Sequence, residues 1–184
     1  MRQIITVILL VWFFGITSAQ PKYLVMDTLS NADGMVIEYY SIGEFHTSLT
    51  PQTGAPRQGI LVPENIGTIE IYKEYKEALK DLEACEYIIV LYHLHMSSKW
   101  NSSVRPPNSK RQFGLFATRS PNRPNSIGFA VIRLHKIDGV FLHVSGIDAF
   151  DGTPVLDIKP WLPSIDCPDN GSNQKIEIEV GLAE

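Results

Sequence analysis

The stretch FAVIRLHKIDGVFLHVS, residues 129–145, predicts a β-hairpin. Residues 129–137 and 140–145 are two β-rich runs, and Asp138 and Gly139 stand between them. Asp-Gly is a strong signal for the tight two-residue turn that joins antiparallel strands. Outward from this hairpin, residues 36–42 and 68–72 are also typical of short strands. The nearly continuous apolar run 87–95 is long enough for a strand buried on both faces.

The remaining pattern indicates a mainly β protein. Residues 73–84 carry Tyr75, Leu79 and Leu82 at helical spacing, with charged residues on the opposite face, and predict one short helix. Residues 148–163 are rich in turn formers, and residues 175–180 alternate and predict a last strand. Many short strands with one helix favour a small single-sheet β-barrel with long functional loops.

Before the hairpin, residues 113–128 read FGLFATRSPNRPNSIG and predict a stiff, cationic loop. Pro121 and Pro124 each fix one backbone angle and hold the loop extended. Arg119 and Arg123 would then present their planar donor forks, which suit a phosphate, a carboxylate or a base edge. The plainer interpretation is a proline-rich connector with solvated arginines.

The basic residues are gathered in one part of the chain. The formal net charge is −4, yet residues 87–137 contain no Asp or Glu and hold eight of the 16 Lys and Arg residues. The remainder of the chain is therefore strongly acidic. A local basic field on an acidic protein favours a polyanionic partner such as RNA, bound at one site.

The first 34 residues form a separate segment. Arg2, the apolar run 4–16 and the small residues 17–19 are typical of a secretory signal peptide, too short for a convincing membrane span. The alternative is a misassigned start, with translation beginning at Met35 or Met26. The predicted domains are a leader at 1–34 and a β-barrel domain at 35–184. Cys85 and Cys167 have no metal or redox spacing and are interpreted as ordinary thiols.

Two small groups of residues have more than one interpretation. His93 and His95 lie two apart on a predicted strand and could ligate a metal, although buried strand histidines without a metal are favoured, and no metal is predicted. Asp148 and Asp151, with Asp157, are either turn formers or include a proton acceptor or a counter-charge for a cationic ligand. Tyr92 and Trp161 could stack on a base or an adenine ring, although most such aromatic residues belong to the core. There is no phosphate-binding glycine loop for a Rossmann site.

Five ordered motifs resemble the TrmO (TsaA-like) family. They are residues 56–59 (PRQG), the strand that ends at His95, residues 104–107 (VRPP), residues 114–128, and residues 151–160 (DGTPVLDIKP). The resemblance covers residues 36–163. It implies a small β-barrel, usually dimeric, that uses S-adenosylmethionine to methylate N6 of threonylcarbamoyladenosine beside the tRNA anticodon. A homodimer in the cytoplasm is therefore expected, or an exported protein if the leader is a genuine signal peptide, with no membrane partner for the folded domain.

The resemblance also implies a set of cofactor-binding residues: Pro56, Arg57, Gln58, His95, Met96, Arg119, Asp148, Asp151, Gly152 and Thr153. Arg119 would bind the carboxylate of the cofactor or of the acceptor through its fork. Asp151 is the first choice for the residue that accepts a proton or stabilises the sulfonium. Arg105, Lys110 and Arg123 are expected to contact RNA phosphates.

The sequence departs from the family pattern at three positions. Ser126 stands where the family usually has a proline, Met96 where some members have Gln, and Trp161 where Tyr is common. Two other functions stay open from the sequence. One is a non-catalytic β-barrel that binds RNA or another ligand, and the other is an exported metal-binding barrel built on His93 and His95.

Overall fold

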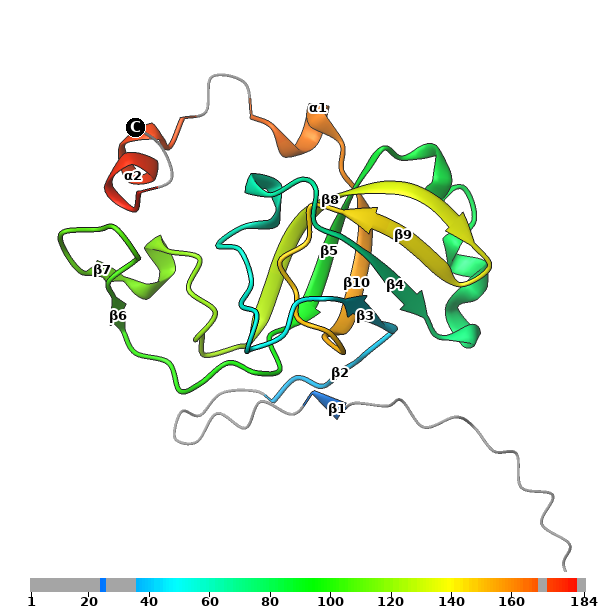
Figure 1. Cartoon of the computed structure of the whole chain (residues 1–184), viewed down its shortest axis with the longest axis horizontal. Coiled ribbons are helices and arrows are strands. Elements are labelled where there is room, and N and C mark those ends of the chain that lie inside the picture. Colours follow the sequence, from blue (N-terminus) through cyan, green and yellow to red (C-terminus); the bar gives the residue numbers. More distant parts are fainter. Residues whose placement is uncertain (1–23, 26–35, 169–171, 182–184) are drawn as a thin grey trace, which may run out of the picture.

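The computed structural model describes residues 24–25, 36–168 and 172–181. The predicted leader therefore lies outside the described residues, apart from the two-residue strand β1 (Leu24–Val25). Six strands form one closed antiparallel barrel in the order β10-β3-β4-β9-β8-β5 (Figure 1). Their bounds are β3 (Gly43–Thr47), β4 (Ile66–Ile71), β5 (Tyr87–His93), β8 (Ile127–Asp138), β9 (Phe141–Ser145) and β10 (Pro154–Pro160). The predicted single-sheet barrel is confirmed.

Alternation along the strands fills the barrel. In β5 the side chains of Ile88, Val90 and Tyr92 are at most 5% exposed, while those between them are half-buried. β5 thus has one fully buried face, and the prediction that both of its faces are buried is wrong. Successive strand residues point to opposite faces, so the other five strands contribute their inward residues to the same core.

The hairpin is confirmed, but its turn lies one residue later than predicted. Asp138 is the last residue of β8 and pairs with Phe141 of β9, so the two turn residues are Gly139 and Val140, and Gly139 has φ +64°. The segment 148–163 differs from its prediction, because it contains β10 after the turn. β10 pairs with β5 on one side and β3 on the other and so closes the barrel.

Three other predicted elements need correction. Within residues 36–42 only β2 (Tyr39–Tyr40) is a strand, paired with β1, and the barrel strand β3 follows it. Residues 73–84 form two 3₁₀ helices, η2 (Lys73–Leu79) and η3 (Leu82–Ala84), in place of one α-helix. Asp81 between them has φ +66°, which interrupts any continuous helix. The apolar side of this segment still packs against the barrel core.

Residues 175–180 do not form the predicted strand. They belong to helix α2 (Gln174–Glu179), in which Ile176 is half-buried and the following Val180 is 7% exposed. The two residues are four apart and lie on one helical face. The alternation of Ile and Glu in this segment fits a strand equally well, which explains the wrong prediction.

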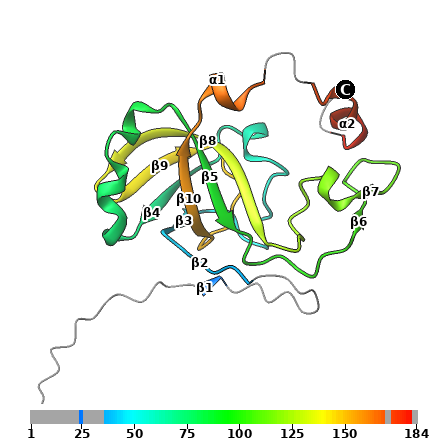
Figure 2. The same cartoon turned by 180° about the vertical axis from the view of Figure 1, so that it is seen from behind.

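Of the remaining short elements, α1 (Pro163–Asp166) follows β10 beside the start of β5. The others, η1 (Gly59–Leu61), β6 (Ser103–Val104), β7 (Phe113–Gly114) and η4 (Leu115–Ala117), belong to the loops at the end of the barrel where β5 ends and β8 begins. β6 pairs with β7, and both views of the fold place α2 beside this pair (Figures 1 and 2). None of the helices in the described part of the chain has the length and apolar character that a membrane crossing requires.

Candidate functional site

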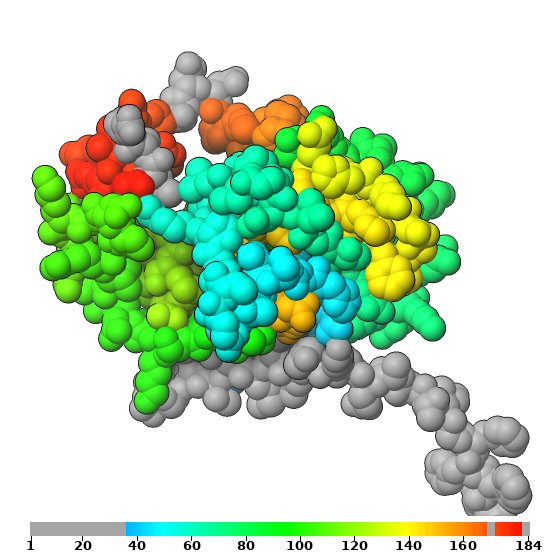
Figure 3. Space-filling view, viewed as in Figure 1, coloured from blue at the N-terminus to red at the C-terminus, as the bar shows by residue number. Residues whose placement is uncertain are grey.

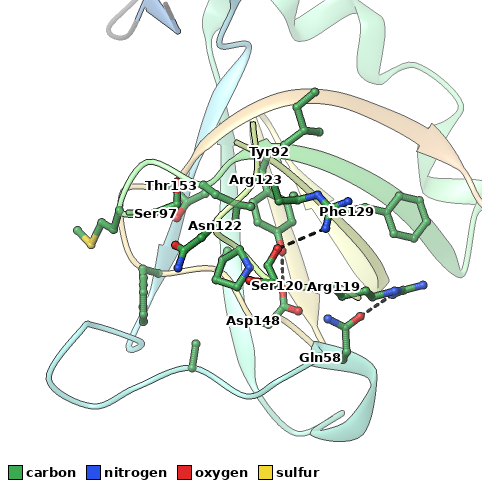
Figure 4. Close-up of a pocket in the computed structure, with 18 of the residues that line it drawn as sticks. Gln58, Tyr92, Ser97, Arg119, Ser120, Asn122, Arg123, Phe129, Asp148 and Thr153 are labelled. Atoms are coloured by element: carbon green, nitrogen blue, oxygen red, sulfur yellow. Dashed lines mark hydrogen bonds between the residues drawn. The ribbon is translucent and has the colours of Figure 1, made fainter. Parts of the chain in front are cut away.

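A cavity of about 590 Å³ opens between the loops at this end of the barrel (Figure 4). Its walls come from the loop 55–58, the end of β5 with residues 94–97, the loop 118–123, the start of β8, and residues 148–150 and 153. Aromatic and aliphatic side chains are combined there with a few polar groups, and the volume is that of a typical small-molecule site. Eight predicted cofactor residues line it: Pro56, Arg57, Gln58, His95, Met96, Arg119, Asp148 and Thr153.

Asp148 is the carboxylate of this cavity. The Tyr92 hydroxyl donates to its Oδ1 at 2.8 Å, and the Gly59 amide donates to its Oδ2 at 3.1 Å. Burial raises the pKa of Asp148 above its ordinary value, while the hydrogen bonds from Tyr92 and Gly59 oppose that shift. A carboxyl group with a raised pKa is a better proton acceptor near neutral pH than an ordinary aspartate.

Tyr92 is fixed by both its burial and its backbone neighbour. Its side chain is 5% exposed, and burial together with the charge of Asp148 raises the pKa of its hydroxyl, which therefore remains a donor. Gly128 pairs with Tyr92 across the sheet, and a Cβ at Gly128 would lie 2.2 Å from the tyrosine ring. Glycine at this position lets the ring lie flat over the neighbouring strand and brings its hydroxyl to Asp148.

His95 and Thr153 form a second polar contact in the cavity wall. His95 Nδ1 lies 3.3 Å from the Thr153 hydroxyl, and Thr153 is only 3% exposed. Burial lowers the pKa of His95, so the neutral imidazole is favoured. A neutral ring beside a hydroxyl can orient a polar ligand without adding charge.

Arg119 stands exposed at the rim of the cavity. Its Nη1 donates to Gln58 Oε1, and the Gln58 amide donates in turn to the Arg57 carbonyl at 2.6 Å. Figure 4 shows the Arg119 and Gln58 side chains side by side. The Arg119 guanidinium also lies 5.7 Å from the centre of the Phe129 ring. A cation held between an amide and an aromatic ring can receive an anionic group of a ligand.

Asp151 and Gly152 do not line the cavity. Asp151 is exposed, its Oδ1 accepts from the Thr47 amide at 3.1 Å, and its own amide donates to the Leu49 carbonyl. Gly152 has φ +71° in the same turn. Both residues thus form a turn, which is the alternative interpretation of this segment from the sequence. Asp148 is the aspartate that lines the cavity.

The three predicted phosphate contacts have different surroundings. Arg123 is half-buried and donates to the Thr118 carbonyl at 3.0 Å, so it stabilises its own loop. Arg105 and Lys110 are exposed, and Arg105 lines a second cavity of about 240 Å³ beside the first.

Several residues of the site had no sequence signal for their role. The Ser126 hydroxyl lies 2.9 Å from that of Ser97, so the residue that replaces a proline links two loops of the cavity wall. Asn122 Oδ1 accepts from the amide and the hydroxyl of Ser98 and links the same loops. Tyr92 is one of the core aromatic residues, and the sequence does not show that its hydroxyl binds Asp148. These contacts join segments distant in sequence, so no local motif marks them.

His93 and His95 do not gather a third metal ligand among the described residues. The chain turns sharply after β5, with the His95 amide bonded to the His93 carbonyl at 2.8 Å. Within the described ranges, the group of three with metal-ligand geometry is Glu44, His46 and Glu70, on β3 and β4.

The closed barrel and its loop-lined cavity define a β-barrel protein with a cavity of the size that small-molecule sites have. The chain belongs to the TrmO family, because the family profile described as "tRNA-methyltransferase O N-terminal domain" matches residues 44–167.

Named relatives and solved structures agree with this family. An Archaeoglobus fulgidus protein named "Probable S-adenosyl-L-methionine-binding protein" is 44% identical over 136 residues, which cover 74% of this chain and 37% of the relative. The mouse protein named "tRNA (adenine(37)-N6)-methyltransferase" is 35% identical, with 70% of this chain and 32% of the relative covered. A crystal structure of TrmO from Pseudomonas aeruginosa superposes with a TM-score of 0.66 at 34% identity, and covers 77% of this chain and 63% of that one. The chain thus spans about a third of the length of the first and the mouse relatives.

Proposed function

We propose that the protein is an S-adenosylmethionine-dependent tRNA methyltransferase that acts on N6 of adenine beside the anticodon, in threonylcarbamoyladenosine. The observation that carries the proposal is the half-buried Asp148, held by Tyr92 and Gly59 inside a cavity whose rim carries Arg119. The relatives named above support the cofactor and the reaction class.

The residues of the cavity fit the cofactor. The volume of about 590 Å³ suits a nucleoside with an amino-acid chain, and the wall combines apolar side chains with Arg119 for a carboxylate. Pro56, Gln58 and residues 94–97 would hold the cofactor, with Thr153 and His95 as polar partners. When bound, the cofactor supplies a methyl group on a positively charged sulfur.

Asp148 then has a defined task. In the transfer, a bond forms between the methyl carbon and N6 of the adenine, the carbon–sulfur bond breaks, and the displaced electron pair stays on sulfur. The N6 proton must leave, and the Asp148 carboxylate is the acceptor within the cavity. The rest of the site aligns the two reactants and excludes water, which is the larger part of such catalysis.

The first test is methyl incorporation into tRNA from labelled S-adenosylmethionine. We expect transfer by the natural chain and a loss of at least about 100-fold in kcat/KM for Arg119→Ala, because the fork contact holds a reactant in place. RNA binding without binding of S-adenosylmethionine would contradict the proposal and favour the non-catalytic barrel. The homodimer and the cytoplasmic location remain expectations from the family resemblance, and sedimentation equilibrium tests the first of them.

Arg105→Ala should weaken tRNA binding and reduce its salt dependence. One lost phosphate contact lowers the slope of log affinity against log salt by about 0.7 to 0.9. Arg105 is exposed beside the site, whereas Arg123 is bonded to its own loop. Fluorescence anisotropy over a series of salt concentrations measures the slope. An unchanged slope for Arg105→Ala would remove this residue from the RNA contacts.

A further inference from the structure

Helix α2 is tied to the wall of the cavity by an arginine. Arg57 Nη1 donates to the Gly181 carbonyl and Nη2 to the Val180 carbonyl, both at 2.9 Å. These carbonyls follow the last turn of the helix, where backbone acceptors lack partners within the helix. The guanidinium fork thus satisfies two acceptors at once, and it is committed to α2 although Arg57 also lines the large cavity.

Two further contacts hold α2 in the same place. Arg111 forms an ion pair with Glu179, and the backbone of Gly181 lies so near the turn at Pro107 and Asn108 that an added Cβ would be in van der Waals contact with both. Val180 is 7% exposed between them. Figure 3 shows α2, in red, lying against the green segment that contains β6 and β7. Contacts from three sides fix the end of the helix on the loops of the site.

The second cavity, of about 240 Å³, lies where these elements meet. Val180 lines it together with Arg105, the turn 104–107, and a wall that it shares with the large cavity: Arg57, Gln58, Thr118, Arg119, Ser120 and Pro121. Its lining includes no carboxylate. Arg57 is committed to α2 and Arg119 Nη1 to Gln58, so Arg105 is the exposed cation of this lining that makes no hydrogen bond to the described residues, and an anion suits it.

We propose that α2 is a wall of the acceptor site: by docking on Arg57 it completes a subsite in the second cavity for an anionic group of the RNA. Arg57 is a positioning residue, not a ligand of the cofactor. The inference rests on the proposed function, which makes the large cavity the place of the methyl donor. The anion is either a carboxylate on the modified nucleotide or a backbone phosphate.

Arg57→Lys tests the inference with little loss of charge. Lysine keeps the positive charge but has no planar fork that could donate to both carbonyls. We therefore expect α2 to detach while the electrostatic potential of the cavity stays positive. We expect KM for tRNA to rise about tenfold, with kcat and the Kd for S-adenosylmethionine changed less than about twofold. Val180→Asp, which places a carboxylate in the second cavity, should give the same pattern. Arg133→Lys is the matched control, because Arg133 pairs with Glu86 on the outside of the barrel.

The result that overturns the inference is a Kd for S-adenosylmethionine that rises as much as KM for tRNA, which would make Arg57 a cofactor ligand. Unchanged KM in both variants would overturn it as well. Comparing tRNA with and without the threonylcarbamoyl group separates the two anions. A KM effect confined to the modified tRNA assigns the subsite to the carboxylate, and an equal effect on both assigns it to a phosphate.

Hydrogen exchange gives a readout that does not depend on methyl transfer. We expect an anticodon stem-loop RNA to slow exchange of the amides at 174–181 in the natural chain, and S-adenosylmethionine alone to leave them unchanged. Slower exchange with RNA in a chain that transfers no methyl group would support the role of α2 and contradict only the reaction. Exchange at 174–181 that RNA does not slow would contradict the role of α2 even in an active enzyme.

Discussion

Asp148→Asn is expected to lower kcat about 100-fold while the Kd for S-adenosylmethionine stays within a few-fold of the natural value. Asparagine has nearly the shape of aspartate and can still accept the Tyr92 hydrogen bond, but it cannot take a proton from N6. Removal of a general base costs on the order of 100-fold to 10,000-fold. Single-turnover transfer measures the chemical step, and isothermal titration measures the cofactor.

The pH profile of the natural enzyme gives the matching result. Burial raises the pKa of Asp148, and the ionised form is the active one. The methyl-transfer rate should therefore be full at pH values above that raised pKa and should fall as the pH drops through it. The fall should occur at a higher pH than the titration of an ordinary aspartate. Asp151→Asn is the control, since this exposed carboxylate bonds the Thr47 amide away from the cavity, and it should keep the natural rate. Equal losses in the two variants would contradict the assignment to Asp148.

Gly128→Ala is expected to lower both stability and activity, although it adds a single methyl group. The new Cβ would lie 2.2 Å from Tyr92 Cε2, so the ring must leave its place in the core. We expect the free energy of unfolding to fall by about 2–3 kcal/mol, the scale of overpacking in a closed core. Displacement of the ring also removes its hydroxyl from Asp148, so kcat should fall with stability. Urea unfolding measures the first effect and labelled transfer the second.

Gly114→Ala is the control for that variant. Gly114 has φ −56° and no atom within 4 Å of an added Cβ, so the change should alter the free energy of unfolding by less than about 1 kcal/mol. A Gly128→Ala protein as stable as Gly114→Ala would show that Tyr92 can move freely, and the account of the site's rigidity would be wrong.

The elements with local signals were predictable. Asp138 and Gly139 are sufficient to predict the β8–β9 hairpin, but not its register, because the turn observed is Gly139-Val140 and Asp138 pairs with Phe141. β10 was missed because its residues lie among turn formers, and its strand character comes from partners such as Tyr92 and Gly43, far away in the sequence. Helix α2 was missed because alternation over six residues fits a strand. Its end is held by hydrogen bonds from Arg57, which is more than 100 residues earlier in the sequence and gives no local signal.

The residues of the site were also predictable only where a local motif marks them. The motifs brought Gln58, His95 and Arg119 to one cavity, as expected. They could not rank Asp148 above Asp151, since both follow the same β-rich run and precede β10. The difference is burial and the two donors Tyr92 and Gly59, which are 56 and 89 residues away along the chain.

The measurement that tests the central claim most directly is transfer of a labelled methyl group to one tRNA prepared with and without threonylcarbamoyladenosine. The account predicts incorporation into the modified tRNA alone, with the label recovered on N6 of that nucleoside by mass spectrometry. It also predicts that Asp148→Asn loses this incorporation and Asp151→Asn keeps it. Incorporation into both tRNAs, at another atom, or into neither while S-adenosylmethionine binds would contradict it.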